Sequence, residues 1–140
     1  MSSIRETAAL FFDACESGQG WDACSRYCHP DASFSAQTDT FAGIDTLAEY
    51  TEAMKGLIAG PVPDASYEIR TFAVDEDRDQ VLGFAIFRGT HTGDGGPVPP
   101  SGKAVETDYV YVMEFDRDRI RHMTKIWNDG YAMRQLGWGA

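Results

Sequence analysis

The stretch KAVETDYVYVMEF, residues 103–115, decides the fold. Its side chains alternate in character along the segment, and a period of two is typical of a β-strand. Three other segments combine β-branched or aromatic residues with polar turns at their ends: residues 67–74, 80–92 and 119–128. The links between these segments suit hairpins, so we predict that the second half of the chain forms an antiparallel meander.

The first half of the chain has helical periodicity instead. From residue 3 to about residue 17, apolar side chains recur at helical spacing, namely Ile4, Ala8, Phe11, Phe12 and Cys15. We predict further helices at 21–28 and between Gly43 and Gly60, with a brief strand at 32–37 between them. Helices followed by strands predict one α+β domain over residues 1–140, with the N-terminal helices packed on a curved antiparallel sheet. The open end of such a sheet is the expected ligand site.

The charge balance excludes two classes of partner. The formal net charge is −10 and the isoelectric point is about 4.5, with no cluster of lysines and arginines to offset it. Such a surface repels the phosphates of nucleic acids and the anionic headgroups of membranes. The first residues, MSSIRETAALFFDACE, contain neither a signal peptide nor a membrane span. We therefore expect a cytoplasmic protein with no nucleic-acid or membrane partner.

The three cysteines are Cys15, Cys24 and Cys28. An odd number in an acidic domain of this size favours reduced, buried thiols over a disulfide framework. Cys24, Cys28 and His29 also allow an interpretation as metal ligands. A structural zinc site needs four ligands at tighter paired spacings, so we expect no metal.

A family resemblance appears when the order of elements is combined with two motifs. The segment RGTHTGDGGPVPPSGK at residues 88–103 and the ending QLGW at residues 135–138 resemble the SnoaL-like polyketide cyclases of the NTF2-like superfamily, which also contains the ketosteroid isomerases. The resemblance covers nearly the whole chain. It implies a cone-shaped, barrel-like α+β fold, a homodimer formed through the outer face of the sheet, and a pocket that works without a cofactor.

The resemblance also implies a position for the catalytic acid. The cyclases carry an Asp near the end of the last strand, which acts as general acid and base in an intramolecular aldol closure. Nine residues before Gly137 this chain has Asn128, and Asp129 is one residue out of register. The position that looks aligned with the proton-shuttling Asp of the isomerases falls near Ala36 or Gln37, so isomerisation by that route is not expected.

Two functions therefore stay open. The first is a cofactor-free cyclase or isomerase that performs acid–base chemistry on an apolar carbonyl compound. The second is a non-catalytic protein that binds a small apolar ligand, because Asn128 replaces the expected Asp. The two functions differ in whether the residue in the catalytic position, Asn128, can support acid–base chemistry.

The candidate catalytic residues are Asn128, Asp129 and His91. Strand alternation places Asn128 on one face and Asp129 on the opposite face, so we predict that Asn128 faces the cavity and Asp129 caps a final helix at 130–136. Asp129 as the acid–base group is the alternative. His91 could act as a base or as an oxyanion donor, or it could be a hydrogen-bonded structural residue. The candidate binding residues are His122, Thr124, Gln37, Phe87 and Tyr109.

One further choice stays open in the sequence. Tyr109 and Tyr111 alternate with Val110 and Val112, so one set faces the helices and the other faces outward. Whichever set faces outward, the outer face of the sheet is too apolar to be freely exposed to solvent. That outer face suggests a sheet-to-sheet homodimer.

Overall fold

The computed structural model describes residues 3–139, and its elements follow the predicted order. They are α1 (Ile4–Glu16), α2 (Trp21–Cys24), the 3-10 turn η1 (Ser25–Tyr27), β1 (Cys28–Ala36), α3 (Leu47–Ala59), β2 (Ser66–Asp75), β3 (Gln80–Thr90), β4 (Ala104–Asp116), β5 (Arg119–Trp127) and α4 (Asp129–Leu136). The second helix is shorter than predicted, because the chain passes through η1 and enters β1 at Cys28.

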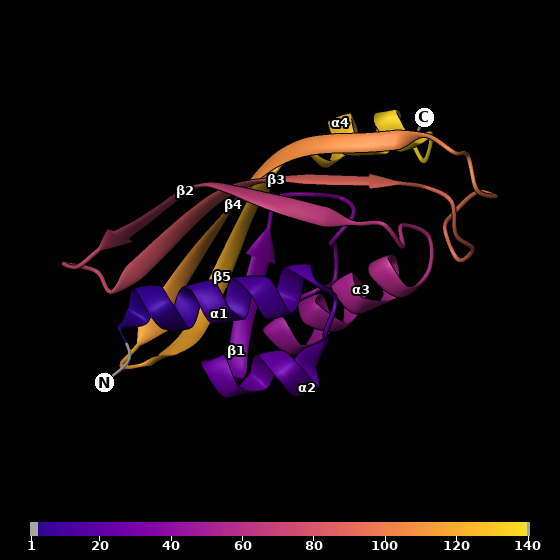
Figure 1. Ribbon diagram of the computed structural model, residues 1–140. Coiled ribbons are helices and arrows are strands. Elements are labelled where there is room, and N and C mark those ends of the chain that lie inside the picture. Colours follow the sequence, from indigo (N-terminus) through magenta and orange to yellow (C-terminus); the bar gives the residue numbers. More distant parts are fainter. Residues whose placement is uncertain (1–2, 140) are drawn as a thin grey trace.

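The strands of the described residues form one curved sheet in the order β1-β5-β4-β3-β2, with β1 and β2 at its edges. The pairs β2–β3, β3–β4 and β4–β5 are antiparallel, which confirms the predicted meander. β1 pairs in parallel with β5, so the sheet is mixed. Figure 1 shows α1, α2 and α3 gathered below the sheet and α4 beside the beginning of β4. The predicted α+β architecture is confirmed.

The tyrosines of β4 are the residues that face the helices. Tyr109 and Tyr111 are buried in the main core, where the ring of Phe12 from α1 packs against both. Val110 and Val112 lie on the outer face and are half-buried. The structure thus settles the choice that the alternating pattern left open.

A bulge in β5 sets which of its residues face inward. Glu114 pairs with His122 but Phe115 pairs with Ile120, so Arg121 is an extra residue on β5. Ile120 and Met123 are both buried despite their odd spacing, and Lys125 follows Met123 on the inner face. His122, Thr124 and Ile126 lie on the outer face in three consecutive alternate positions, paired with Glu114, Val112 and Val110.

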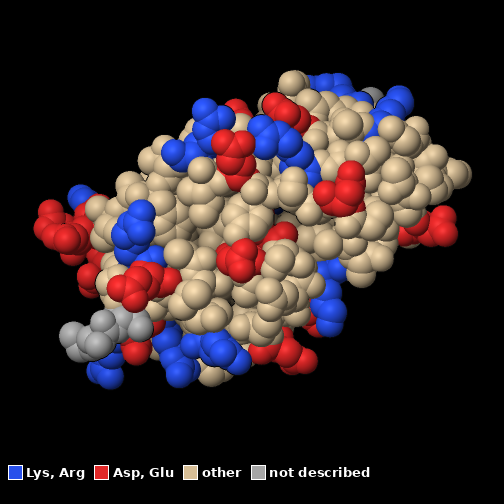
Figure 2. Space-filling model, viewed as in Figure 1, with Lys and Arg blue, Asp and Glu red and all other residues tan. Residues whose placement is uncertain are grey.

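α4 contributes a small second cluster in which Ala132 and Leu136 pack on Val105 of β4. The helix ends at Gly137, whose φ of 74° is left-handed and is easily adopted only by glycine. Within residues 3–139 no helix is long and apolar enough to cross a membrane. Figure 2 shows acidic and basic side chains interspersed on the face that it displays.

Candidate functional site

A cavity of about 40 Å³ lies on the inner side of the sheet. Its walls come from the end of α1, from α3, from the loop before α3 and from the inner faces of β3, β4 and β5; they are formed by Glu16, Phe41, Met54, Leu57, Phe87, Thr107, Tyr109, Lys125 and Trp127. The volume suits a water molecule, whereas pockets for drug-sized ligands have volumes of about 300–1,000 Å³. A larger ligand therefore requires the cavity to widen.

Glu16 places a carboxylate in this apolar wall. It is the last residue of α1 and is only 2% exposed. The hydroxyl of Tyr111 donates a hydrogen bond to Oε2 at 2.7 Å, and the hydroxyl of Tyr109 donates to Oε1. A negative charge at the C-terminal end of a helix is opposed by the helix dipole, so this carboxylate depends on its partners in the site.

Lys125 supplies the opposite charge from β5. Its side chain is 6% exposed, and Nζ donates a hydrogen bond to the hydroxyl of Tyr50 at 2.9 Å. Nζ also lies 4.3 Å from the ring centroid of Trp127 and 4.9 Å from that of Phe41. The rings of Tyr50, Tyr109 and Tyr111 complete an aromatic cage at 5.2–5.7 Å. Aromatic faces attract a cation, which offsets part of its lost hydration.

The two charges are joined by a chain of hydroxyl groups. Tyr50 accepts from Lys125 and Tyr111 donates to Glu16, so the hydrogen bond between the two tyrosines must run from Tyr50 to Tyr111. The result is a directed relay from Lys125 through Tyr50 and Tyr111 to Glu16. Such a relay can pass a proton from the amine to the carboxylate without water.

The pKa values in the site reflect burial. Burial lowers the pKa of Lys125 to about 8, although the nearby Glu16 charge acts in the opposite direction. Burial, and then the Glu16 charge, raise the pKa values of Tyr50 and Tyr111 well above the ordinary value, so both hydroxyls keep their protons. One small cavity therefore contains a cationic group, a carboxylate and hydroxyl groups that carry protons. These groups can act in acid–base chemistry.

Of the predicted binding residues, Phe87 and Tyr109 line this cavity. The others lie elsewhere. Gln37 and Thr124 line a separate groove of about 450 Å³ near the pairing of β1 with β5. His122 lies on the outer face, where its ring nitrogens are 2.6 Å from Ser33 Oγ and 3.0 Å from Ser35 Oγ.

His91 is buried just beyond β3, away from the cavity. Its Nδ1 accepts hydrogen bonds from the indole N–H of Trp138 at 2.9 Å and from the backbone N–H of Ser101 at 3.2 Å. Because Nδ1 accepts, the proton of the neutral ring lies on Nε2, which has no hydrogen-bond partner among the described residues. The two hydrogen bonds of His91 connect the end of β3 with the loop after it and with Trp138.

The structure contradicts the predicted division between Asn128 and Asp129, because Asn128 is the helix cap and neither side chain lines the cavity. Asn128 is the N-cap of α4, and its side chain accepts a hydrogen bond from the backbone N–H of Tyr131 at 3.0 Å. Asp129 is the first residue of α4, and its carboxylate accepts from the backbone N–H and the hydroxyl of Thr40 at 3.1 and 2.8 Å. The prediction failed because the cavity lies on the face of Lys125 and Trp127, not on the face of His122.

The Asp129 carboxylate is nevertheless connected to the cavity, because it binds Thr40 in the loop before α3. Thr40 precedes Phe41, whose ring forms part of the cavity wall. Burial raises the pKa of Asp129, but the hydrogen bonds from Thr40 outweigh this effect and lower it. The ionised carboxylate thus anchors the loop that contributes Phe41 to the cavity wall.

Sequence reasoning missed Glu16, Tyr50 and Lys125. One signal was available: Glu16 is an acidic residue in the last turn of a helix, where a basic residue is preferred. Residues that break a local preference often mark a functional site. For Lys125 the signal was hidden, because the bulge at Arg121 changes the phase of β5.

Comparisons with known proteins place this geometry in context. The family model described as SnoaL-like polyketide cyclase matches residues 6–136. No curated protein matches the chain.

Among solved structures, IdmH from Streptomyces antibioticus, described as a candidate polyketide cyclase, is 21% identical with a TM-score of 0.78, and the match covers 97% of this chain and 99% of that one. A candidate polyketide cyclase from Acidithiobacillus ferrooxidans is 25% identical with a TM-score of 0.76, with coverage of 100% and 99%. AclR from Streptomyces galilaeus, described as a candidate hydroxylase, is 17% identical with a TM-score of 0.76, with coverage of 98% and 86%.

Proposed function

The chain belongs to the SnoaL-like polyketide cyclase family, and from this premise we propose that it binds a small apolar carbonyl compound in the inner cavity and moves protons on it without a cofactor. The family and the shared NTF2-like fold support a protein that binds a small molecule. The chemistry and the site are our proposal. The single observation that carries it is the relay that joins buried Lys125 to buried Glu16 at the cavity wall.

In the proposed reaction Glu16 is the base. Its carboxylate removes a proton from the carbon next to the carbonyl group of the ligand, and negative charge develops on the carbonyl oxygen. Lys125, which also lines the cavity, stabilises that charge. The enolate carbon then attacks a second carbonyl carbon of the same ligand, and the proton held by Glu16 passes to the new alkoxide oxygen. The closure is an intramolecular aldol addition.

Asn128, Asp129 and His91 act indirectly in this proposal. Asn128 starts α4, and Asp129 fixes the loop that carries Phe41. Because the cavity holds only about 40 Å³, this loop is the segment that we propose to move when a ligand enters. A direct catalytic role for any of the three residues stays a prediction.

The proposed chemistry predicts hydrogen–deuterium exchange at carbon. We expect the protein to accelerate exchange of the α-hydrogens of heptane-2,6-dione in deuterated water, because enolisation is the first step of the reaction. Nuclear magnetic resonance of the diketone measures exchange and ring closure in the same sample. The control is the Glu76→Gln variant, since Glu76 is an exposed carboxylate on the surface.

The same experiment decides between the two functions. The small volume of the cavity favours the alternative, a non-catalytic protein that binds an apolar ligand. Tight binding of the diketone, with exchange no faster than in buffer, would establish the alternative and reject the enzyme.

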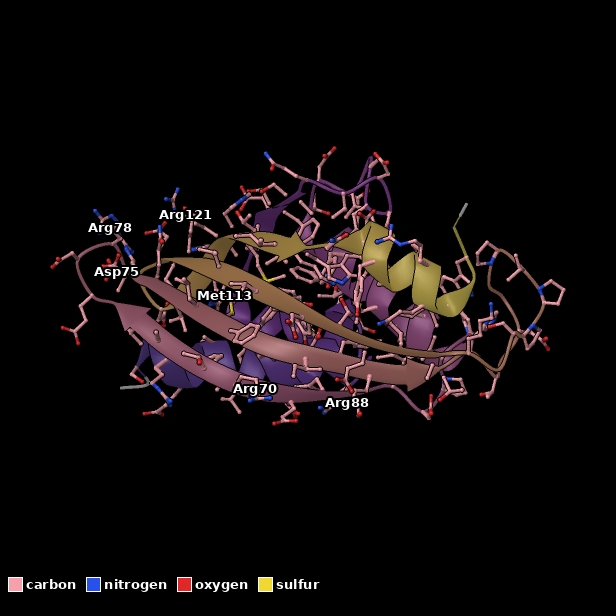
Figure 3. All side chains as sticks on the ribbon, turned by 90° about the horizontal axis from the view of Figure 1, so that it is seen from above. Arg70, Asp75, Arg78, Arg88, Met113 and Arg121 are labelled. Atoms are coloured by element: carbon pink, nitrogen blue, oxygen red, sulfur yellow. The ribbon has the colours of Figure 1, made fainter. Side chains whose placement is uncertain are left out.

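We also propose a homodimer through the outer face of the sheet. Val112 lies opposite Leu82, and Val110 lies between Phe84 and Ile126, so these side chains form a continuous apolar patch. Ile126 is 59% exposed in the single chain. Arg88, which is labelled in Figure 3, follows Phe84 on the same face of β3. It donates hydrogen bonds to Glu68 and Glu106 and can form a polar rim to the patch. Large exposed apolar patches mark interfaces.

The dimer predicts a mass of two chains in sedimentation at micromolar concentration. Val110→Lys places a charge in the middle of the patch and should give a folded monomer, because an unpaired charge is costly in an apolar interface. Glu76→Gln should leave the dimer intact. A wild-type protein that sediments as a monomer at these concentrations would reject the proposal.

We propose a cytoplasmic location as well. Cys15, Cys24 and Cys28 are all buried as free thiols, and a reducing compartment keeps thiols in this state. Cell fractionation with an antibody against the protein tests it, and recovery from an oxidising compartment would reject it.

A further inference from the structure

We propose that Lys125 is a covalent catalytic residue that forms a Schiff base with the carbonyl group of a small ketone or aldehyde in the cavity. The inference rests on the proposed function, because it concerns the same ligand class in the same cavity. It goes beyond that function by making Lys125 a nucleophile and not only a charge that stabilises the enolate.

The hydrogen-bond geometry of Lys125 fits a Schiff base better than an ammonium ion. An ammonium group has three N–H donors, whereas a protonated Schiff base has one. Among the described residues Nζ has a single acceptor, the hydroxyl of Tyr50 at 2.9 Å. The other two hydrogens of the ammonium group have no acceptor among the described residues, so the group uses one of its three donors.

The cage also suits the charge of the product. The ammonium ion and the protonated Schiff base both carry one positive charge at the same nitrogen. The five aromatic rings around Nζ and the carboxylate of Glu16 therefore stabilise the product as they stabilise the free side chain. The fixed surroundings need no new counter-charge, so the step requires little reorganisation.

The relay gives the protons a path. The ammonium group releases one proton, which shifts through Tyr50 and Tyr111 to Glu16, and leaves a neutral amine. The amine nitrogen bonds to the carbonyl carbon, and one of its two hydrogens moves to the oxygen to give a carbinolamine. The C–O bond then breaks, the oxygen leaves as water with the proton that Glu16 had received, and a C=N bond with one N–H remains. The sum is ammonium plus carbonyl compound to protonated Schiff base plus water.

The chain contains its own controls for a trapping experiment. Lys55 and Lys103 are its other lysines, and both are exposed. Burial lowers the pKa of Lys125 to about 8, so a much larger fraction of this amine is neutral at pH 7 than of a lysine with the usual pKa of about 10.4. Lysines desolvated in this way are known nucleophiles for carbonyl groups.

The experiment uses acetone as the probe and sodium cyanoborohydride as the reductant at pH 7. Reduction of the Schiff base leaves an isopropyl group on the amine, and peptide mapping by mass spectrometry measures its rate of appearance on each lysine. We expect Lys125 to be labelled at least about tenfold faster than Lys55 or Lys103, because of its larger neutral fraction. Since the wild-type protein is used, the result does not depend on whether a variant folds.

The pH dependence is a second expected result. The titratable groups that face Lys125 are Glu16 and Cys15 from α1, Tyr50 from α3, and Tyr109 and Tyr111 from β4. Burial raises the pKa values of Cys15 and the three tyrosines and lowers that of Lys125 to about 8. Labelling of Lys125 should increase with pH and level off above about 8, whereas labelling of Lys55 should continue to rise.

Each outcome has a definite meaning. Labelling of Lys125 no faster than that of Lys55 and Lys103 overturns the Schiff base. If α-hydrogen exchange continues in that case, the proposed function stands with Lys125 as a non-covalent charge. Lys125→Arg keeps the positive charge but cannot form the Schiff base, so we expect exchange to be lost in this variant. Exchange at the wild-type rate in Lys125→Arg would also overturn the inference.

Discussion

Replacing Lys125 by methionine should lower the free energy of unfolding by about 3–5 kcal/mol, the range for removing one partner of a buried charge pair. The reason is Glu16, whose carboxylate would stay in the apolar wall with two tyrosine hydroxyls but without a cation. Methionine fills a similar volume, so a cavity contributes little to the loss. Denaturant unfolding at pH 7 measures the effect.

The double variant Lys125→Met/Glu16→Gln shows whether charge is the cause. Replacing both members of a buried pair by neutral groups is often nearly neutral for stability, so the double variant should be more stable than Lys125→Met alone by about 1 kcal/mol or more. Lys55→Met is the matched control at an exposed lysine and should change stability by no more than about 0.5 kcal/mol. Strictly additive losses in the double variant would show that the two charges do not depend on each other.

The fold was predictable because its signals are local. The alternation in residues 103–115 and the helical stripe of Ile4, Ala8, Phe11, Phe12 and Cys15 each fix one element by its own periodicity. Both patterns survive in the structure as β4 and α1. The parallel pairing of β1 with β5 was not predicted, since it joins segments that are far apart in the sequence and carries no turn signal.

The site was less predictable because it depends on phase and on distant partners. A single extra residue, Arg121, decides that Lys125 faces inward and His122 outward, and a one-residue change of register moves every following side chain to the other face. Glu16 lies at the other end of the chain from Lys125. The hydrogen bonds that connect Glu16 with Lys125 run through Tyr50 and Tyr111. They form only after α1, α3, β4 and β5 have packed together.

Glu16→Gln should reduce α-hydrogen exchange of heptane-2,6-dione by about 10²- to 10⁴-fold, the usual contribution of a positioned general base. Glutamine has nearly the same shape, but its amide does not accept a proton at neutral pH. Binding of the diketone should change little, since most of the cavity wall is apolar. The measurement is the exchange rate at saturating diketone, with Glu76→Gln as the control for loss of a carboxylate at the surface.

The same variant separates the base from the nucleophile. The Glu16 charge raises the pKa of Lys125, so its removal should lower that pKa further and leave more neutral amine at pH 7. Reductive trapping of acetone on Lys125 should then persist in Glu16→Gln, and the pH at which it levels off should move below about 8, while exchange is lost. If Glu16 had only a structural role, its replacement would reduce α-hydrogen exchange and reductive trapping together. If exchange in Glu16→Gln equals that of the wild type, Glu16 is not the base, and Asp129 becomes the next carboxylate to test.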